Sequence, residues 1–116
     1  MSKITFSDFE CMMKYSLKEK LKKNTEPCIE ILFCVDDCED YQESWLGKML
    51  NQNTNSDLYW FGLTPDGLQG YNFNSFEEFI NAKVFCGKNL KEVWDSISLL
   101  LIDACDVEER LQFYVN

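Results

Sequence analysis

A β-hairpin is predicted by residues 58–73, which read Leu58-Tyr59-Trp60-Phe61-Gly62-Leu63-Thr64-Pro65-Asp66-Gly67-Leu68-Gln69-Gly70-Tyr71-Asn72-Phe73. Residues 58–63 are mostly aromatic or aliphatic, a composition typical of a strand. Residues 64–67 place proline second and glycine last, which favours a β-turn because proline fixes φ and glycine tolerates positive φ. We therefore expect residues 68–73 to return antiparallel to residues 58–63.

Four further segments have the composition of strands or of a loop between them. Residues 28–35, Cys-Ile-Glu-Ile-Leu-Phe-Cys-Val, are short and rich in β-branched and aromatic side chains, which favours a strand. An alternative is that residues 25–27, Thr-Glu-Pro, open a helix, because proline suits the first helical turn. Residues 43–49 predict a weaker strand, residues 98–102 predict a buried one, and the wholly polar residues 51–57 predict a loop.

The N-terminal region predicts one amphipathic helix over residues 7–23. Residues 7–10, Ser-Asp-Phe-Glu, form a capping box, in which the serine and glutamate side chains satisfy backbone amides of the first turn. Apolar side chains then recur every three or four positions, as one face of a helix requires. This stripe comprises Phe6, Phe9, Met13, Leu17 and Leu21.

Three helices are predicted in the second half of the chain. A second capping box opens residues 75–81, and Asn89 is a similar start for the next helix. We expect Trp94 in the core, because it shares an apolar stripe with Leu90, Val93 and Ile97. Asp106 begins the last helix, and residues 113–115 form an apolar tail that we expect to dock on the protein.

This order of elements predicts an α+β fold, a mainly antiparallel sheet with helices packed on one face, in a single domain over residues 1–116. The length is close to the commonest domain size. With 46% hydrophobic and 15% aromatic residues, the chain can build a core without metals or disulfides.

Charge is distributed unevenly along the chain, which has 20 acidic and 11 basic residues and a net charge of −9. The excess of acid lies after residue 27, because the first 27 residues hold six lysines against four acids. The first acidic cluster comprises Asp36, Asp37, Glu39, Asp40 and Glu43, and the second comprises Asp103, Asp106, Glu108 and Glu109. Each follows a predicted core strand, so parallel neighbouring strands would bring both into one negative patch. That patch would bind a basic protein partner, although ordinary solvated loops explain the clusters equally well.

Aromatic side chains are concentrated around the predicted hairpin. In a strand, Tyr59 and Phe61 face one side and Trp60 faces the other, so one side packs in the core. The opposite side could carry an aromatic interaction patch, for which the candidates are Tyr59, Trp60, Phe61 and Tyr71. The alternative is that helices cover both faces of the sheet.

Several classes of chemistry lack their residues in this sequence. There is no histidine, which excludes a Ser-His-Asp triad and a histidine-containing zinc site. The spacing of Gly62, Gly67 and Gly70 matches no phosphate loop, and the acidic clusters match no calcium loop. The acidic charge disfavours binding to nucleic acid. We therefore expect a protein that is not an enzyme, with no catalytic residue, cofactor or metal site.

The six cysteines and the hydropathy pattern indicate a cytoplasmic protein. The N-terminus lacks the apolar region of a signal peptide, and the longest apolar run, residues 99–102, is too short to cross a membrane. No C-x-x-C pair occurs, which disfavours zinc and thioredoxin-like sites. We therefore expect all six cysteines to be reduced thiols packed in the core.

A resemblance to known proteins rests on three segments between Leu58 and Arg110. They read Tyr-Trp-Phe-Gly-Leu-Thr-Pro-Asp-Gly at 59–67, Ser-Phe-Glu-Glu-Phe at 75–79 and Leu-Lys-Glu-Val-Trp-Asp at 90–95. In these segments, and in size and acidity, the chain resembles small bacterial domains of immunity-protein type, some of them encoded beside toxins. The resemblance implies a cytoplasmic binding protein that neutralises a basic toxin such as a nuclease, and it transfers no functional residue. Two alternatives stay open: a carboxylate-based enzyme or divalent-cation-binding domain, and an accessory or regulatory subunit.

Overall fold

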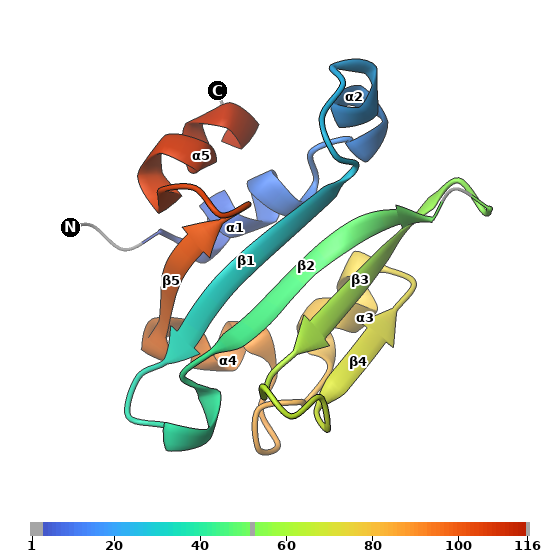
Figure 1. Cartoon of the computed structure of the whole chain (residues 1–116). Helices are drawn as coiled ribbons and strands as arrows, with labels where there is room; N and C mark the ends of the chain where they lie inside the picture. The colour runs from blue at the N-terminus through green and yellow to red at the C-terminus, as the bar shows by residue number, and fades with distance from the viewer. Residues whose placement is uncertain (1–3, 52, 116) are drawn as a thin grey trace.

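The protein is built on one five-stranded sheet in the order β4-β3-β2-β1-β5, in which every neighbouring pair is antiparallel (Figure 1). The computed structural model describes residues 4–51 and 53–115. The strands are β1 (Cys28–Val35), β2 (Ser44–Asn51), β3 (Ser56–Gly62), β4 (Gly70–Phe73) and β5 (Ile97–Ile102). The predicted α+β class and its antiparallel sheet are confirmed.

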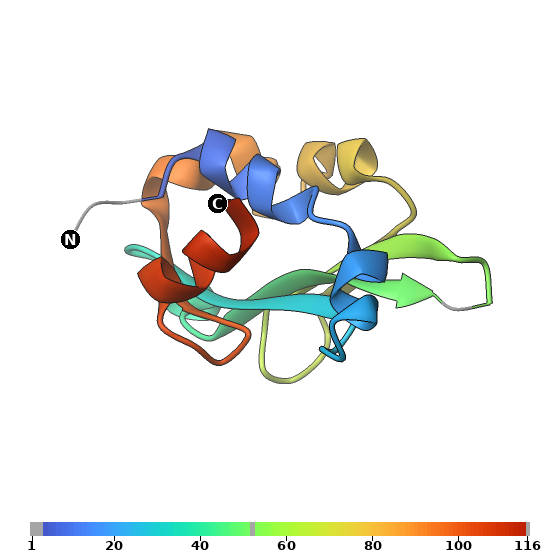
Figure 2. The same cartoon turned by 90° about the horizontal axis from the view of Figure 1, so that it is seen from above.

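The helices α1 (Phe6–Met13), α3 (Phe76–Asn81), α4 (Leu90–Val93) and α5 (Val107–Val115) lie on one face of this sheet (Figure 2). The short helix α2 (Leu17–Lys22) lies beside the start of β1, at the end of the sheet. On the opposite face, only loops approach the sheet within the described part of the chain. The prediction of helices on one face is therefore confirmed, and the alternative of two covered faces is wrong.

The positions of the strands agree closely with the sequence pattern, but β5, which was expected to be buried, is an edge strand with Leu100 exposed. β1 has the predicted bounds, so the alternative of a helix after Pro27 is wrong. The hairpin forms with Tyr59 opposite Phe73, but β4 begins at Gly70, two residues later than predicted. Gly67 has a φ of +76°, and its amide donates to the carbonyl of Thr64 at 3.2 Å, which closes the predicted turn. The predicted loop over residues 51–57 is shorter, because β2 and β3 extend into it.

The predicted helix over residues 7–23 is wrong, because the chain forms two helices there. The hydroxyl of Thr5 accepts the amide of Asp8 at 3.1 Å, so α1 is capped by Thr5 and begins before the predicted cap. The hydroxyl of Ser16 accepts the amide of Glu19 at 3.3 Å and starts α2 as a separate helix. This break turns Leu21, which the stripe placed in the core, toward solvent.

The remaining helices begin where their caps predicted. Ser75 caps α3, and Asn89 forms a complete capping box with Glu92 at the start of α4. α4 is short, because a 3₁₀ turn over Trp94–Ser96 leads directly into β5 and places Ile97 in the strand. The carboxylate of Asp106 accepts the amide of Glu109 at 3.1 Å, as expected of a cap. The apolar tail is the last turn of α5, and it docks through the buried Tyr114.

Aromatic side chains fill the core between the sheet and the helices. Phe61 of β3 stacks on Phe79 of α3, with 4.4 Å between ring centroids. At the other end of the core, Trp94 packs against Phe9 of α1, with 4.9 Å between centroids. The expected burial of Trp94 is confirmed, because 6% of this residue is exposed. These two clusters attach the helices to one face of the sheet only.

Candidate functional site

The open face is the side of the sheet that no described helix covers. Its apolar residues alternate with the core residues along each strand, and the register places Leu32 between Trp45 and Leu101. We define the open face as Leu32, Cys34, Trp45, Met49, Leu58, Trp60 and Leu101. All seven side chains are partly or largely exposed.

Trp60 occupies the middle of the open face, above a glycine of the neighbouring strand. Gly47 lies opposite Trp60 in the register of β2 and β3. A methyl group on Gly47 would lie 3.1 Å from Cζ2 of Trp60 and 2.0 Å from the carbonyl oxygen of Ile29. The missing side chain therefore lets the indole ring lie close to the sheet, which makes the centre of the open face flat and apolar.

The predicted aromatic patch does not form as one surface. Tyr59 and Phe61 are buried, with their rings 5.6 Å and 4.4 Å from that of Phe79. Tyr71 lies opposite Phe61 in the register, which places it on the helix side near the start of β4. Of the four candidates, only Trp60 faces away from the helices. The sequence analysis did not include Trp45 and Met49. Alternation in residues 43–49 places both on one face of the strand, but because Ser44 and Lys48 lie on the other face, the pattern would put the two apolar residues in the core.

The two acidic clusters do not form the single negative patch that parallel strands would have produced, because β1 and β5 are antiparallel. The loops that follow these strands therefore leave from opposite ends of the sheet. The five members of the first acidic cluster are exposed in the loop between β1 and β2, which includes a 3₁₀ turn over Glu39–Tyr41. Asp36 is held at the sheet, since its carboxylate accepts the hydroxyl of Ser98 at 2.9 Å.

In the second acidic cluster, Asp103 is an internal group. Its carboxylate accepts hydrogen bonds from the hydroxyl of Tyr114, from Nε of Arg110 at 3.0 Å and from the amide of Glu30 at 2.9 Å. Burial pushes the pKa of Asp103 upward, but these hydrogen bonds and Lys20 outweigh burial and lower it below its ordinary value. Asp103 is therefore occupied within the fold, whereas Asp106, Glu108 and Glu109 are exposed.

Two lysines, Lys20 and Lys48, are also buried, and no sequence pattern predicted their burial. Lys20 is 2% exposed and donates to the carbonyl of Cys28 at 2.5 Å and to the hydroxyl of Tyr114 at 2.6 Å. Lys48 is 1% exposed and donates to the carbonyl of Tyr15 at 2.8 Å. Burial lowers the pKa of Lys48, and its salt bridge with Asp57, at 3.2 Å, counters part of this effect. Both ammonium groups have internal partners, and Lys20 also lines a hollow beside Trp45 together with Asp103 and Arg110.

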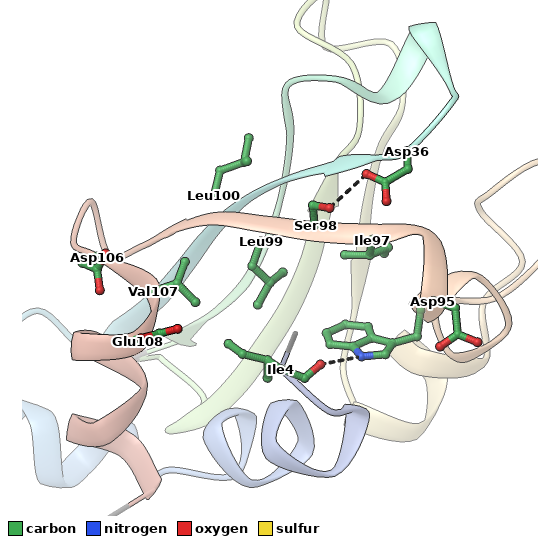
Figure 3. A pocket seen from close by; sticks show the side chains of 11 residues that line it. Ile4, Asp36, Asp95, Ile97, Ser98, Leu99, Leu100, Asp106, Val107 and Glu108 are labelled. Atoms are coloured by element: carbon green, nitrogen blue, oxygen red, sulfur yellow. Dashed lines mark hydrogen bonds between the residues drawn. The ribbon is translucent and has the colours of Figure 1, made fainter. Parts of the chain in front are cut away.

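A groove of about 320 Å³, which we call the edge groove, runs beside the outer edge of β5 (Figure 3). Its apolar lining includes Ile4, Ile97, Leu99 and Val107, which lie on the helix side of the sheet. The backbone at Ile4 is fixed because its carbonyl accepts the indole N–H of Trp94 at 3.0 Å.

Every ionisable side chain that lines the edge groove within the described chain is a carboxylate. These side chains are Asp36, Asp95, Asp106 and Glu108. The groove therefore brings together one member of the first acidic cluster and two of the second, from opposite ends of β5 (Figure 3). Asp37, Glu39, Asp40, Glu43, Asp103 and Glu109 do not line it.

The cysteines differ from the expectation of core thiols. All six are free, but Cys11, Cys86 and Cys105 are exposed and the other three are half-buried. Burial, followed by the nearby carboxylate of Glu30, raises the pKa of the Cys28 thiol to about 11. A thiol with this pKa stays protonated near neutral pH and is a poor nucleophile.

Comparison with known proteins adds no relative. No protein-family model matches this chain, and no curated protein or solved structure matches it either. Among the residues that the structure describes, no group of three or more cysteine, aspartate or glutamate side chains is arranged to hold a metal ion. Within the same residues, no helix has the length and apolar character needed to cross a membrane.

Proposed function

We propose that this protein is a non-enzymatic binding domain that covers a basic surface of another protein with its open face, as an immunity protein covers a toxin. The observation that carries the proposal is that the helices of the described chain cover one face of the sheet and leave the other open. On the other face, Trp45 is 36% exposed and Met49 is 47% exposed. Trp60 of β3 lies on the same face, opposite Gly47 of β2.

The composition of the open face suits a protein interface. Tryptophan and methionine are enriched in interface centres, and tryptophan is among the residues that contribute most to binding energy. The surroundings are acidic, since Glu30 is exposed on the same face of β1 and the first acidic cluster follows the end of that strand. An apolar centre with a negatively charged rim favours a partner whose own rim is basic. With a net charge of −9, the chain would also attract such a partner at long range.

The carboxylates give less support to the alternative of an enzyme or a cation-binding domain. Asp103, the member of the second acidic cluster with the most internal contacts, is saturated by hydrogen bonds from the fold itself. The first acidic cluster is exposed along a loop rather than gathered in a cleft.

The proposal is tested by capturing the partner with matched variants of the tagged protein. The bait is incubated with an extract of the organism that encodes the chain, as the wild type, as the double variant Trp45→Ala/Met49→Ala and as the control Leu68→Ala. Leu68 is 84% exposed in the hairpin turn, so the control removes an exposed apolar side chain away from the open face. We expect the wild type and the control to retain one basic protein in stoichiometric amount, and the double variant to lose it.

Three results would overturn the proposal: no stoichiometric partner, an acidic partner, or equal retention by the double variant. The immunity function has its own test, in which the captured protein is expressed with and without this chain. We expect the partner to arrest growth when expressed alone, and co-expression of this chain to restore growth. A partner that is harmless alone would contradict the immunity function.

A further inference from the structure

β5 is an edge strand whose protection against further pairing is confined to its second half, where Leu100 forms a bulge and Ile102 pairs with Cys105. β1 lies on one side of it, and within the described chain no strand lies on the other. Its six residues, Ile-Ser-Leu-Leu-Leu-Ile, include neither a charged residue nor a proline, the residues that commonly block an exposed edge. At the other edge of the sheet, β4 has four residues and offers a shorter template.

The outer edge of β5 offers hydrogen-bonding groups for an added strand. In an antiparallel pair, alternate residues direct their backbone N–H and C=O groups away from the partner strand. The outward N–H and C=O groups of Ile102 already pair with Cys105, at 3.1 Å and 2.8 Å, so the groups open to an added strand lie over the first part of β5, beside the edge groove. The register shifts between Leu32 and Phe33, so Leu100 is an extra residue on β5 and its side chain lies exposed at the rim of the groove.

The edge groove has the apolar lining that an added strand needs. Ile97 and Leu99 of β5 face the helix side together with Val107 at the start of α5 (Figure 3). An added strand would direct every second side chain to this side, because side chains alternate between the faces of a sheet. Two apolar side chains separated by one residue could therefore pack against this lining.

The charges of the edge groove determine which residues are favoured at the two ends of an added strand. Asp36 and Asp95 lie toward the start of β5, whereas Asp106 and Glu108 lie toward its end (Figure 3). No lysine or arginine among the described residues lines the groove. Lysine or arginine side chains near both ends of the added strand would meet these carboxylates, whereas acidic ones would be repelled.

We propose that the edge groove binds an extended segment of the partner as a sixth strand of the sheet, beside β5. The segment has alternating apolar residues at its centre and basic residues at both ends. This inference rests on the proposed function for its choice of a basic protein partner. It adds a second contact surface, the edge of the sheet, to the open face.

Synthetic peptides test this inference without the natural partner. The probe is the peptide RKVTVKR with blocked ends, and the control is EEVTVEE, which keeps the centre and reverses the charge. Binding is followed by titration into the isotope-labelled whole protein, with amide chemical shifts as the readout. We expect the basic peptide to bind with shifts concentrated on Ser98, Leu99 and Leu100, and the acidic peptide not to bind.

Methylation of single peptide nitrogens separates strand addition from simple charge attraction. Neighbouring N–H groups of a strand point in opposite directions, so only one of two adjacent nitrogens can donate to β5. We compare the probe methylated at its threonine nitrogen with the probe methylated at its second valine nitrogen. Exactly one of these two peptides should lose binding if the probe adds to the edge, and charge attraction alone would leave both binding equally.

Matched variants of the protein locate the charges that matter. The groove variant carries Asp36→Asn, Asp95→Asn, Asp106→Asn and Glu108→Gln, in which asparagine still caps α5. The control variant removes the same charge from the first acidic cluster outside the groove, through Asp37→Asn, Glu39→Gln, Asp40→Asn and Glu43→Gln. We expect the groove variant to weaken peptide binding by about tenfold or more, and the control to change it by less than about threefold.

Failure of the basic peptide to bind, equal binding of the acidic peptide, or equal effects of the two variants would overturn the inference. Shifts centred on Trp45, Met49 and Trp60 would also overturn it, because they would place the peptide on the open face. The proposed function is judged separately, by capture of the whole partner with the open-face variant. Loss of peptide binding alone therefore removes the edge contact and leaves the open face as the proposed interface.

Discussion

The indole N–H of Trp94 donates a hydrogen bond to the backbone carbonyl of Ile4 at 3.0 Å, although 90 residues separate the two along the chain. The ring of Trp94 also contacts those of Phe6 and Phe9, at 5.3 Å and 4.9 Å between centroids. One side chain therefore joins the first helix of the protein to the turn that precedes β5. Its removal should loosen both elements.

We expect Trp94→Ala to lower the free energy of unfolding by about 3–5 kcal/mol, the usual cost of truncating a buried aromatic side chain. Urea denaturation of the wild type and the variant measures this change. Trp45→Ala is the matched control, because Trp45 is partly exposed on the open face, and its cost should stay within about 1 kcal/mol. Equal costs for the two tryptophans would contradict the assigned core.

Because the carboxylate of Asp103 is held inside the protein, its substitution should also lower the free energy of unfolding by a large amount. Asp103→Asn leaves the ammonium of Lys20 buried without its counter-charge, and we expect a loss of roughly 3 kcal/mol at pH 7. Because the pKa of Asp103 is lowered in the folded state, its contribution is complete above the ordinary pKa of 3.8 and is lost as the pH falls through the folded value. The difference between wild type and variant should therefore shrink in acid.

Urea denaturation at pH 7 and at pH 3 tests this pH dependence. Asp40→Asn serves as the control, because Asp40 is exposed in the first acidic cluster and its loss should cost less than about 0.5 kcal/mol. If Asp103→Asn were as mild as Asp40→Asn, the carboxylate would be solvated rather than held by Lys20, Arg110 and Tyr114.

The contact between Gly47 and Ile29 predicts a position that tolerates no side chain. A methyl group on Gly47 would lie 2.0 Å from the carbonyl oxygen of Ile29, which is backbone and cannot turn away. We expect Gly47→Ala to cost about 4 kcal/mol or more, or to prevent folding. Gly62→Ala is the control, since its methyl group would lie 3.9 Å from Cζ3 of Trp60, an ordinary contact distance, and we expect a change of about 1 kcal/mol or less. Circular dichroism during thermal unfolding distinguishes the two outcomes.

The cysteines should react in an order set by their surroundings. Alkylation with iodoacetamide at pH 8 should modify the exposed Cys11, Cys86 and Cys105 first and Cys28 last, because the pKa of Cys28 is raised to about 11. Mass spectrometry of the digested protein measures each rate, and unfolded protein provides the reference in which the six rates should become similar. A count of fewer than six free thiols before labelling would contradict the prediction that all are reduced.

Local features of this fold were predictable from the sequence. β1 was predicted with its observed bounds, because eight residues rich in β-branched and aromatic side chains carry a strong local preference. Ser75, Asn89 and Asp106 cap their helices as predicted, because a cap depends on residues three positions apart. The apolar stripe of the first helix was misleading, because Ser16 restarts the helix within a pattern that continues through it.

The relations between distant segments were not predictable in the same way. The relative direction of β1 and β5 decides whether the acidic clusters meet, and no local pattern encodes a direction between strands that 61 residues separate. The buried state of Lys20 depends on Asp103 and Tyr114, which lie 83 and 94 residues away. In the candidate site, alternation within residues 43–49 places Trp45 and Met49 on one face of the strand but would put that face in the core. Only the assembled sheet reveals that no helix covers them.

The first acidic cluster predicts that association with the partner depends on salt. Long-range attraction acts mainly on the association rate, and ionic screening shortens its range to about 8 Å at physiological ionic strength. We expect slower association and a weaker salt dependence in a variant that carries Asp36→Asn, Asp37→Asn, Glu39→Gln and Asp40→Asn. The fold should survive, because all four side chains are exposed.

Stopped-flow association rates at low and high salt measure this effect once the partner has been captured. The control removes four charges from the helices instead, through Glu10→Gln, Glu19→Gln, Glu77→Gln and Glu78→Gln. It changes the net charge equally but on helices rather than in the loop between β1 and β2, so it should retain more of the wild-type rate. If the loop variant matched the wild type at both salt concentrations, the first acidic cluster would have no part in binding, and the apolar side chains of the open face would have to account for recognition alone.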